Sequence, residues 1–140
     1  MTINEIQEKI IDEFSLFDDW MDKYNLLIDM GKDLPAVDVK FKVKDFLIEG
    51  CQSKVWLHPE YDGNLITFTA DSDAIITRGI VALLIQVLSG RTPEEIISAD
   101  LYFIEKIGLR QNLSPTRSNG LLSMVRQIKL YAMAYNAINK

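Results

Sequence analysis

The sequence predicts an α+β fold in which a small three-stranded antiparallel sheet packs against helices. Three observations lead to this prediction: helical apolar spacing over residues 3–28, short runs rich in β-forming residues over 46–69, and helical spacing again from residue 74 onward. Because helices flank the strands at both ends of the chain and do not alternate with them, the strands are expected to pair with their neighbours in sequence. The 140 residues, 48% of them hydrophobic, are enough to bury a core without disulfides or metal.

The chain opens with two predicted helices that form a hairpin. Thr2 and Glu5 have the spacing of a capping box, in which each side chain accepts a hydrogen bond from a free backbone N–H at the helix start. Apolar residues then recur at helical spacing, first over residues 3–14 and again over residues 17–28. Gly31 is a suitable C-terminal cap for the second helix, and a proline soon follows it.

The middle of the chain carries the strand signals. Residues 37–43 alternate apolar and charged side chains, which is the period of a half-buried strand, but the same residues also suit an extended loop across the surface. Better strand candidates are residues 46–48, 54–58 and 65–69, which are rich in apolar and β-branched side chains. The Tyr61-Asp62-Gly63-Asn64 sequence between the last two is typical of a hairpin turn.

The second half of the chain is predicted to be helical. Residues 71–73 are short acceptors and carboxylates, which favour the start of a helix. The helix that follows, over residues 74–88, is apolar on most sides and is therefore expected to be buried in the centre. Residues 92–95 form a second capping box with proline at the first helical position, residues 100–107 form a short helix, and a last helix over 114–138 begins at a Ser-Pro pair.

Composition excludes several classes of function. The net charge is −5 and no basic stripe is visible, so nucleic acid is not expected as a partner, because phosphate binding requires clustered Lys and Arg. No apolar run is long enough to cross a bilayer and no secretory signal is apparent, so no membrane association is expected. A single cysteine cannot form an internal disulfide, which fits a reducing compartment, and we expect a cytoplasmic protein.

Cys51 is the candidate site in the middle of the chain. It follows Gly50 and precedes the polar residues Gln52, Ser53 and Lys54, so it is expected at the tip of a turn. A lone cysteine is most often a small buried hydrophobic residue, whereas a nearby lysine favours the reactive thiolate. The residues alone therefore leave open a thiol enzyme of the peroxidase type and a binding module in which the cysteine is incidental, with the binding module slightly favoured.

Metal binding and Cys–His catalysis find little support in the sequence. The chain has one cysteine and one histidine, whereas zinc sites usually draw on several such ligands. His58 and Cys51 are expected on one strand and the turn before it, where the rise of about 3.3 Å per residue keeps them apart. We therefore expect no metal site.

Arg117 is the candidate in the C-terminal half. It falls in the first turn of the last predicted helix, where the helix dipole mildly disfavours a positive side chain, so an anionic partner or a site role is indicated. Asp71 and Asp73 are interpreted first as helix caps.

Four stretches carry a resemblance to a known family: Leu34-Pro35, Gly50-Cys51-Gln52-Ser53-x-Val55-Trp56, Asp71-Ser72-Asp73-Ala74 and Leu113-Ser114-Pro115-x-Arg117-Ser118-x-Gly120-Leu121. Taken together, these motifs resemble the SufE family of cysteine-desulfurase partner proteins. The order and spacing agree over nearly the whole chain, so we expect one SufE-like domain over residues 1–140 with a fold similar to the IscU scaffold. The resemblance also implies that residues 37–43 form a loop.

The resemblance implies a sulfur relay. Cys51 would accept persulfide sulfur from a SufS-like, pyridoxal-phosphate-dependent cysteine desulfurase, increase its turnover, and pass the sulfur to an iron–sulfur scaffold protein. The chain itself would bind no cofactor and would not be an independent enzyme. By the same resemblance, the residues expected to shape the loop or to meet the partner are Gly50, Gln52, Ser53, Asp73 and Arg117, and Asp73 and Arg78 would influence how the loop releases toward the partner. Because a persulfide is reactive, we expect an apolar pocket to shelter Cys51 when the partner is absent.

Overall fold

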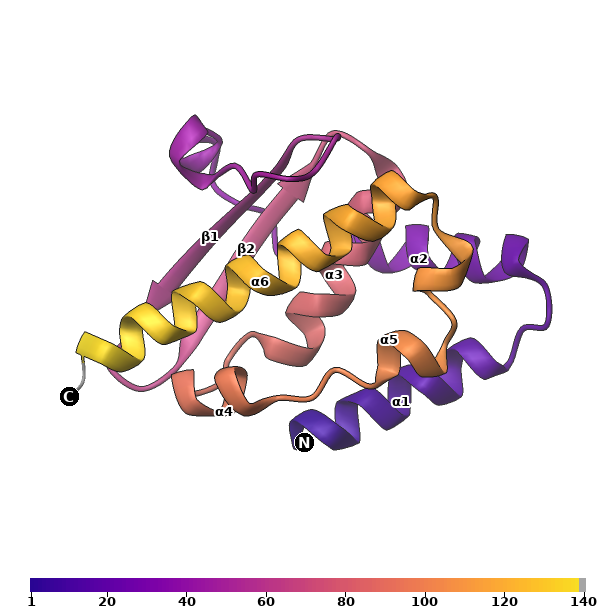
Figure 1. Ribbon diagram of the computed structural model, residues 1–140, viewed down its shortest axis with the longest axis horizontal. Helices are drawn as coiled ribbons and strands as arrows, with labels where there is room; N and C mark the ends of the chain where they lie inside the picture. The colour runs from indigo at the N-terminus through magenta and orange to yellow at the C-terminus, as the bar shows by residue number, and fades with distance from the viewer. Residues whose placement is uncertain (139–140) are drawn as a thin grey trace.

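The apolar helix predicted over residues 74–88 forms the centre of the structure as α3, Ile75–Leu88. The computed structural model describes residues 1–138 (Figure 1). Ten of the residues of α3 are buried, and the helix packs against α1 (Ile3–Ser15), α2 (Trp20–Lys32), β2 (Ile66–Ser72) and α6 (Pro115–Ile138). These four elements therefore surround α3 and cover the apolar side chains on most of its sides, as a buried central helix requires.

The two N-terminal helices form as predicted, with one correction. The Thr2–Glu5 capping box is present, and α2 begins at Trp20 behind Asp19, whose carboxylate accepts a hydrogen bond from the backbone of Met21. Gly31 was predicted as the C-terminal cap of α2, but this was wrong, because Gly31 is buried inside the helix. Its role is steric.

Gly31 and Gly79 allow α2 and α3 to approach each other closely. A Cβ atom placed on Gly31 would lie 3.0 Å from the backbone nitrogen of Gly79, and one placed on Gly79 would lie 2.3 Å from the carbonyl oxygen of Leu27. The second distance is shorter than real side chains tolerate, so the packing of the two helices depends on glycine.

The sheet has two strands among residues 1–138, not the predicted three. β1, Val55–Tyr61, pairs with β2 in antiparallel register, and Asp62 in the turn accepts hydrogen bonds from the backbone of Asn64 and Leu65. The predicted strand over residues 46–48 was wrong: it contributes one isolated bridge, between Leu47 and Trp56. A 3₁₀ turn over Lys44–Phe46 occupies the residues that a longer strand would need.

Short contacts cover the outer edge of β2 and the start of the outer edge of β1. On the outer edge of β2, Ala36 bridges to Ala70 and Arg91 bridges to Ile66. Between these two bridges the backbone N–H of Phe68 donates to the hydroxyl of Ser89 at 2.8 Å. On the outer edge of β1, the N–H of Ile48 donates to the carbonyl of Val55 at 2.9 Å.

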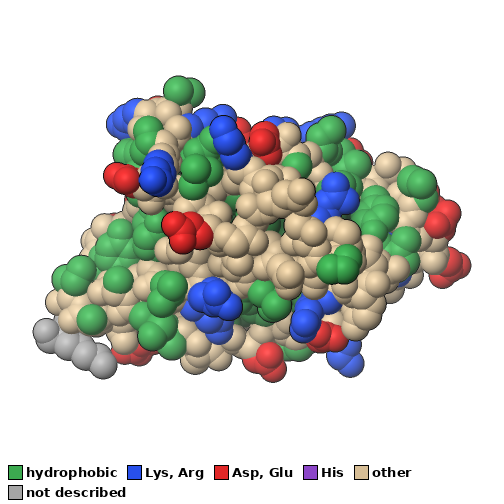
Figure 2. Space-filling model, turned by 45° about the horizontal axis from the view of Figure 1, so that its top comes forward, with side chains coloured by type: hydrophobic (Ala, Val, Ile, Leu, Met, Phe, Trp, Pro, Cys, Tyr) green, Lys and Arg blue, Asp and Glu red, His purple; other side chains and the backbone are tan. Residues whose placement is uncertain are grey.

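Residues 38–46, called the arm below, form a loop rather than a strand. The arm contains two 3₁₀ turns, Val39–Phe41 and Lys44–Phe46, so the strand interpretation of its alternating pattern was wrong and the loop interpretation is confirmed. The ring of Phe41 stacks on His58 of β1 with centroids 3.6 Å apart, and Phe46 meets the same ring edge-on. The arm projects from the body of the molecule with exposed hydrophobic and Lys side chains (Figure 2).

Asp71 ties the arm to the hairpin and to α3. Its carboxylate accepts a hydrogen bond from Lys42 at 2.5 Å and another from the Nε of Arg78 at 3.0 Å, while Arg78 also donates to the carbonyl of Ser72. Asp71 was predicted as a helix cap, but it lies in β2. Burial acts to raise the pKa of Asp71, yet the hydrogen bonds and charges around it, from Lys42 first, hold the pKa below its ordinary value.

Replacing Asp71 is expected to weaken the fold more at neutral pH than in acid. A carboxyl whose pKa is depressed by folding contributes stability above its unfolded pKa and loses that contribution as the pH falls through the folded pKa. We expect Asp71→Asn to lower the free energy of unfolding by about 1 kcal/mol at neutral pH, and the difference from wild type to shrink below a pH of about 4. Urea unfolding across this range measures it.

Asp18→Asn is the matched control, because Asp18 is exposed and makes no ion pair in the described part of the chain. It should leave the pH dependence of unfolding unchanged. A stability gap for Asp71→Asn that stayed constant from neutral to acid pH would show that the ion pairs are not its cause.

The C-terminal half follows the predicted order of helices. α4, Pro93–Ser98, has its capping box, α5 spans Phe103–Lys106, and a 3₁₀ turn at Arg110–Asn112 leads into α6. α6 runs diagonally across the molecule, with its first turns near the end of the hairpin where β2 leads into α3 (Figure 1). Among residues 1–138, no helix combines the length and the hydropathy needed to cross a bilayer.

Candidate functional site

The turn that carries Cys51 lies against α6. Residues 49–54, called the cysteine loop below, connect the arm segment to β1, and Gly50 has a φ of 91°, which favours glycine. A Cβ atom placed on Gly50 would lie 2.3 Å from the Oγ of Ser123. Gly50 therefore meets both requirements of the docked loop: it adopts the left-handed conformation and it leaves room for α6.

The thiol of Cys51 points at the backbone of α6. Its Sγ donates a weak hydrogen bond to the carbonyl of Gly120 at 3.5 Å, and a Cβ atom on Gly120 would lie 3.4 Å from that sulfur. Cys51 is half-buried, and this burial raises the pKa of its thiol. Because the thiolate is the nucleophile, burial in the docked loop shifts the balance toward the less reactive protonated thiol.

The other end of the cysteine loop is fastened to the end of β2. The backbone N–H of Lys54 donates to the carboxylate of Asp73 at 3.0 Å, and the hydroxyl of Ser72 donates to the carbonyl of Lys54 at 2.8 Å. Asp73 was predicted as a cap of α3, but this was wrong, because the cap residue is Ala74 and no side chain caps the helix. Asp73 instead anchors the base of the loop.

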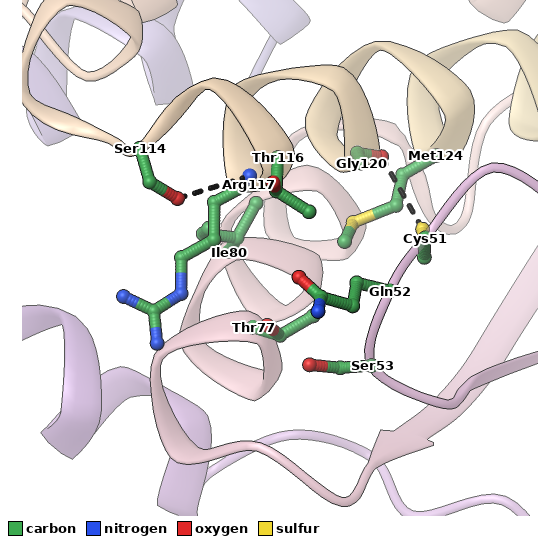
Figure 3. A pocket seen from close by; sticks show the side chains of 10 residues that line it. All are labelled: Cys51, Gln52, Ser53, Thr77, Ile80, Ser114, Thr116, Arg117, Gly120 and Met124. Atoms are coloured by element: carbon green, nitrogen blue, oxygen red, sulfur yellow. Dashed lines mark hydrogen bonds between the residues drawn. The ribbon is translucent and has the colours of Figure 1, made fainter.

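The cysteine loop, α3 and the first turns of α6 enclose a pocket of about 300 Å³ (Figure 3). Of the residues singled out in the sequence, Gln52, Ser53 and Arg117 line it together with Cys51, whereas Gly50 and Asp73 do not. The pocket thus brings together the two unusual stretches, although 66 positions separate Cys51 from Arg117 in the sequence. The remaining lining residues are Thr77, Ile80, Ser114, Thr116, Gly120 and Met124.

The lining of the pocket is rich in hydrogen-bond donors. An apolar shelter for Cys51 was predicted, but the side chains of Ile80 and Met124 are the main apolar contribution, and the others are chiefly hydroxyls, an amide and a guanidinium. No carboxylate lines the pocket. Arg117 carries its only formal charge, and within residues 1–138 that guanidinium makes no ion pair. The pocket therefore has the electrostatics of an anion site.

Thr77 is one of the lining residues that the sequence interpretation missed, together with Ile80, Thr116 and Met124. It is a polar residue in the first turn of a helix that is otherwise nearly all apolar, and this contrast is the signal by which it was detectable. Arg78, expected near the loop, pairs with Asp71 and reaches the loop only indirectly, through Ser72.

Metal binding and Cys–His catalysis were the other two chemistries considered from the sequence, and the structure bears on each. Residues 1–138 contain no group of three His, Cys, Asp or Glu side chains arranged to hold a metal ion. The imidazole of His58 is packed between the rings of Phe41 and Phe46 on the arm.

Substitution of Gly50 is expected to release the cysteine loop from α6. Alanine at this position is disfavoured by the positive φ, and its Cβ would lie 2.3 Å from the Oγ of Ser123, so we expect the loop to move away from α6. Once the thiol leaves its half-buried position, its pKa falls toward the ordinary value. We expect Gly50→Ala to increase the rate of Cys51 alkylation by iodoacetamide at neutral pH, because a larger fraction of the released thiol is thiolate.

Gly63→Ala provides the control for this experiment. Gly63 also has a positive φ, of 95°, but it lies in the hairpin turn with no atom within 4 Å of an added Cβ. It should cost some stability and leave the alkylation rate unchanged. Equal alkylation rates in wild type and Gly50→Ala would show that docking on α6 does not control the reactivity of Cys51.

Comparison with known proteins identifies the family. Residues 8–132 match the family model SufE, described as an Fe–S metabolism associated domain. The chain is 41% identical over 127 residues to an uncharacterized SufE-like protein of Rhizobium meliloti (strain 1021), covering 87% of this chain and 91% of the relative. It is 37% identical over 135 residues to SufE-like protein 1, chloroplastic/mitochondrial, of Arabidopsis thaliana, covering 94% of this chain and 36% of that longer relative.

A solved structure supports the fold independently. The solution structure of a hypothetical protein from Thermus thermophilus superposes with a TM-score of 0.77 at 16% identity, over 94% of this chain and 96% of the other. At this level of identity the likeness concerns the fold alone. The family model and the relatives in sequence, by contrast, show kinship over most of the chain, and the chain belongs to the SufE family.

Proposed function

We propose that this protein accepts sulfur from a pyridoxal-phosphate-dependent cysteine desulfurase onto Cys51 and passes it to iron–sulfur cluster assembly. The observation that carries the proposal is the placement of the only cysteine on a loop that is docked against α6 beside a donor-lined pocket. Membership of a family associated with Fe–S metabolism supports the same reading. Pyridoxal phosphate belongs to the desulfurase, and no cofactor is assigned to this chain.

The proposed transfer is a thiol–disulfide type of exchange. The Cys51 thiolate attacks the outer sulfur of the desulfurase persulfide, a new S–S bond forms on Cys51, and the desulfurase cysteine leaves as a thiolate. The proton released by Cys51 passes to solvent or to the leaving thiolate. No oxidant is needed, because the oxidised sulfur is already present in the donor.

In this scheme the residues around Cys51 have different roles. Gly50 and Asp73 hold the two ends of the cysteine loop, and the partner must compete with these contacts to reach the sulfur. Gln52 and Ser53 follow Cys51 directly and shape the loop, and their backbone N–H groups are candidates to stabilise a persulfide anion. Arg117 presents an exposed positive charge to the partner.

Two alternatives have less support. A peroxidase-type enzyme lacks the support that membership of a family associated with Fe–S metabolism gives to the sulfur-acceptor proposal. If the protein were a binding module with an incidental cysteine, the close packing of Gly50 and Cys51 against α6 would have no functional explanation. The proposal places the protein in a reducing compartment such as the cytoplasm, with a desulfurase and a scaffold protein as partners and neither nucleic acid nor a membrane.

The mass of the intact protein tests the proposal. After incubation with a cysteine desulfurase, pyridoxal phosphate and L-cysteine, we expect a gain of one sulfur atom that a reductant reverses, together with faster desulfurase turnover. A parallel incubation without L-cysteine should give no gain. If a desulfurase proven to be active produced no change in mass, the sulfur-acceptor function would be refuted.

A further inference from the structure

The pocket beside Cys51 has features that transfer between two proteins does not require. A partner protein needs only a thiol that its own persulfide can reach. Here the thiol opens onto a pocket of about 300 Å³, a volume suited to a small molecule. The pocket and its lining therefore need a separate explanation.

Thr77 is the first of these features. Its exposed fraction is 5%, and among residues 1–138 its hydroxyl has no hydrogen-bond partner. No fully enclosed side-chain oxygen or nitrogen in the described structure lacks a partner, so the Thr77 hydroxyl must be reached from the pocket that it lines. Within an almost fully buried residue, this hydroxyl thus faces the pocket free of any protein partner in the described part of the chain and is available to hydrogen-bond a molecule that enters it.

The arrangement of charge is the second feature. Arg117 lines the pocket without a carboxylate partner in the described part of the chain, although the chain has 20 acidic residues. Ser114 accepts a hydrogen bond from the backbone of Arg117, and the hydroxyl of Thr116 lies in the same first turn of α6. Every polar side chain in the lining is able to donate a hydrogen bond, so the pocket selects for an anion.

The third feature is the separation between the thiol and the charge. Figure 3 shows Cys51 at one end of the pocket and the Arg117 guanidinium at the other, with Gln52 and Thr77 between them. A ligand that fits this arrangement presents sulfur at one end and a negative group at the other.

We propose that the pocket binds a small molecule that carries a sulfane sulfur and an anionic head group, and that Cys51 accepts sulfur from it without a protein donor. Thiosulfate and the persulfide of a small amino-acid thiol both have this chemistry. Arg117 holds the anionic group, and Thr77 and Gln52 donate to the middle of the ligand. This inference rests on the proposed role of Cys51 as a sulfur acceptor and adds a second source of sulfur.

The reaction is balanced for either donor. The Cys51 thiolate attacks the outer sulfur, the bond between that sulfur and the rest of the donor breaks, and Cys51 becomes a persulfide. The leaving group is sulfite from thiosulfate, or the free thiolate from a small persulfide. The Cys51 proton passes to solvent or to the leaving group, and no electrons enter from outside.

The rate of Cys51 loading, followed by intact mass with no desulfurase present, tests the inference. We expect the rate to saturate as the concentration of thiosulfate or of cysteine persulfide rises. Arg117→Gln should raise the half-saturating concentration at least about tenfold, which is the loss expected for a hydrogen bond to a charged group. Arg126→Gln is the matched control, because Arg126 is an exposed arginine on the same helix outside this pocket, and it should change nothing.

Thr77 separates a role in binding from a role in packing. Thr77→Val keeps the shape and removes the hydroxyl, so we expect slower loading at low donor concentration, and Thr77→Ser should restore the rate. Should the valine variant fail to fold, the serine variant and the exposed Arg117 still decide the question. Saturation with only one donor would support the site and identify the head group that it accepts.

A loading rate that rises linearly with donor concentration and is equal in wild type, Arg117→Gln and Arg126→Gln would overturn the inference. Loading would then be the ordinary chemistry of a thiol with no ligand site. The same protein is loaded in parallel by an active desulfurase with L-cysteine. If only the desulfurase loaded Cys51, the sulfur-acceptor function would stand and the small-molecule site would be refuted. If neither the desulfurase nor the small donors loaded Cys51, the sulfur-acceptor function and the small-molecule site would both be refuted.

Discussion

Replacing Cys51 by serine is expected to abolish sulfur acceptance and to leave the fold almost unchanged. Serine has nearly the same shape, and its hydroxyl is able to donate to the carbonyl of Gly120 as the thiol does. We therefore expect the free energy of unfolding to stay within about 0.5 kcal/mol of wild type, as is usual when no cavity or unpaired group is created. The hydroxyl cannot form a persulfide, so the gain of one sulfur atom should disappear completely.

Two measurements on the serine variant separate chemistry from structure. Intact mass after incubation with the desulfurase and L-cysteine reports sulfur transfer, and urea unfolding reports stability. Desulfurase turnover should also lose the part of its stimulation that depends on removal of the persulfide. A serine variant that stimulated the desulfurase as well as wild type would make Cys51 incidental and favour the binding-module alternative.

Replacing Gly79 by alanine is expected to destabilise the protein by roughly 2–4 kcal/mol. The sign of this effect is diagnostic. Within a helix the same substitution ordinarily stabilises by about 1 kcal/mol, because alanine has the higher helix propensity. Here the added Cβ would lie 2.3 Å from the carbonyl oxygen of Leu27 and 2.8 Å from its Cγ, so α2 and α3 must move apart.

Gly120→Ala is the control for the stability of the Gly79 variant. Gly120 is also a buried helical glycine, but an added Cβ would meet the sulfur of Cys51 at 3.4 Å, which is ordinary contact. Urea unfolding should show Gly120→Ala to be at least as stable as wild type. If Gly79→Ala were also neutral or stabilising, the close approach of α2 and α3 would not be a determinant of the fold.

Signals between residues near one another in the sequence were sufficient to predict most helices. The two capping boxes and the apolar composition of α3 depend on residues near one another in sequence, and the structure contains all three. The predicted strand over residues 46–48 and the predicted cap at Gly31 were wrong because contacts distant in sequence decide both positions. Phe46 belongs to a 3₁₀ turn and its ring meets His58, and Gly31 packs against the backbone of Gly79.

The candidate site shows the same division. Cys51, Gln52, Ser53 and Arg117 were identified from sequence patterns, and the structure brings them to one pocket. The polar character of that pocket was not predictable, because it depends on which residues of α3 and α6 face the loop. Asp73 has the chemistry of a helix cap, but its carboxylate accepts from Lys54, 19 residues away, and no local pattern distinguishes the two acceptors.

The covered edges of the hairpin bear on strand pairing between copies of this chain. An open strand edge is a template on which a second copy can pair and begin to aggregate. Along β2, the outward N–H groups of Ile66, Phe68 and Ala70 already donate to Arg91, Ser89 and Pro35. On β1, Pro59 shares the outward register of Val55 and has no N–H to offer. The β2 edge therefore has few free donors for a further strand, and Pro59 interrupts any ladder that would form along β1.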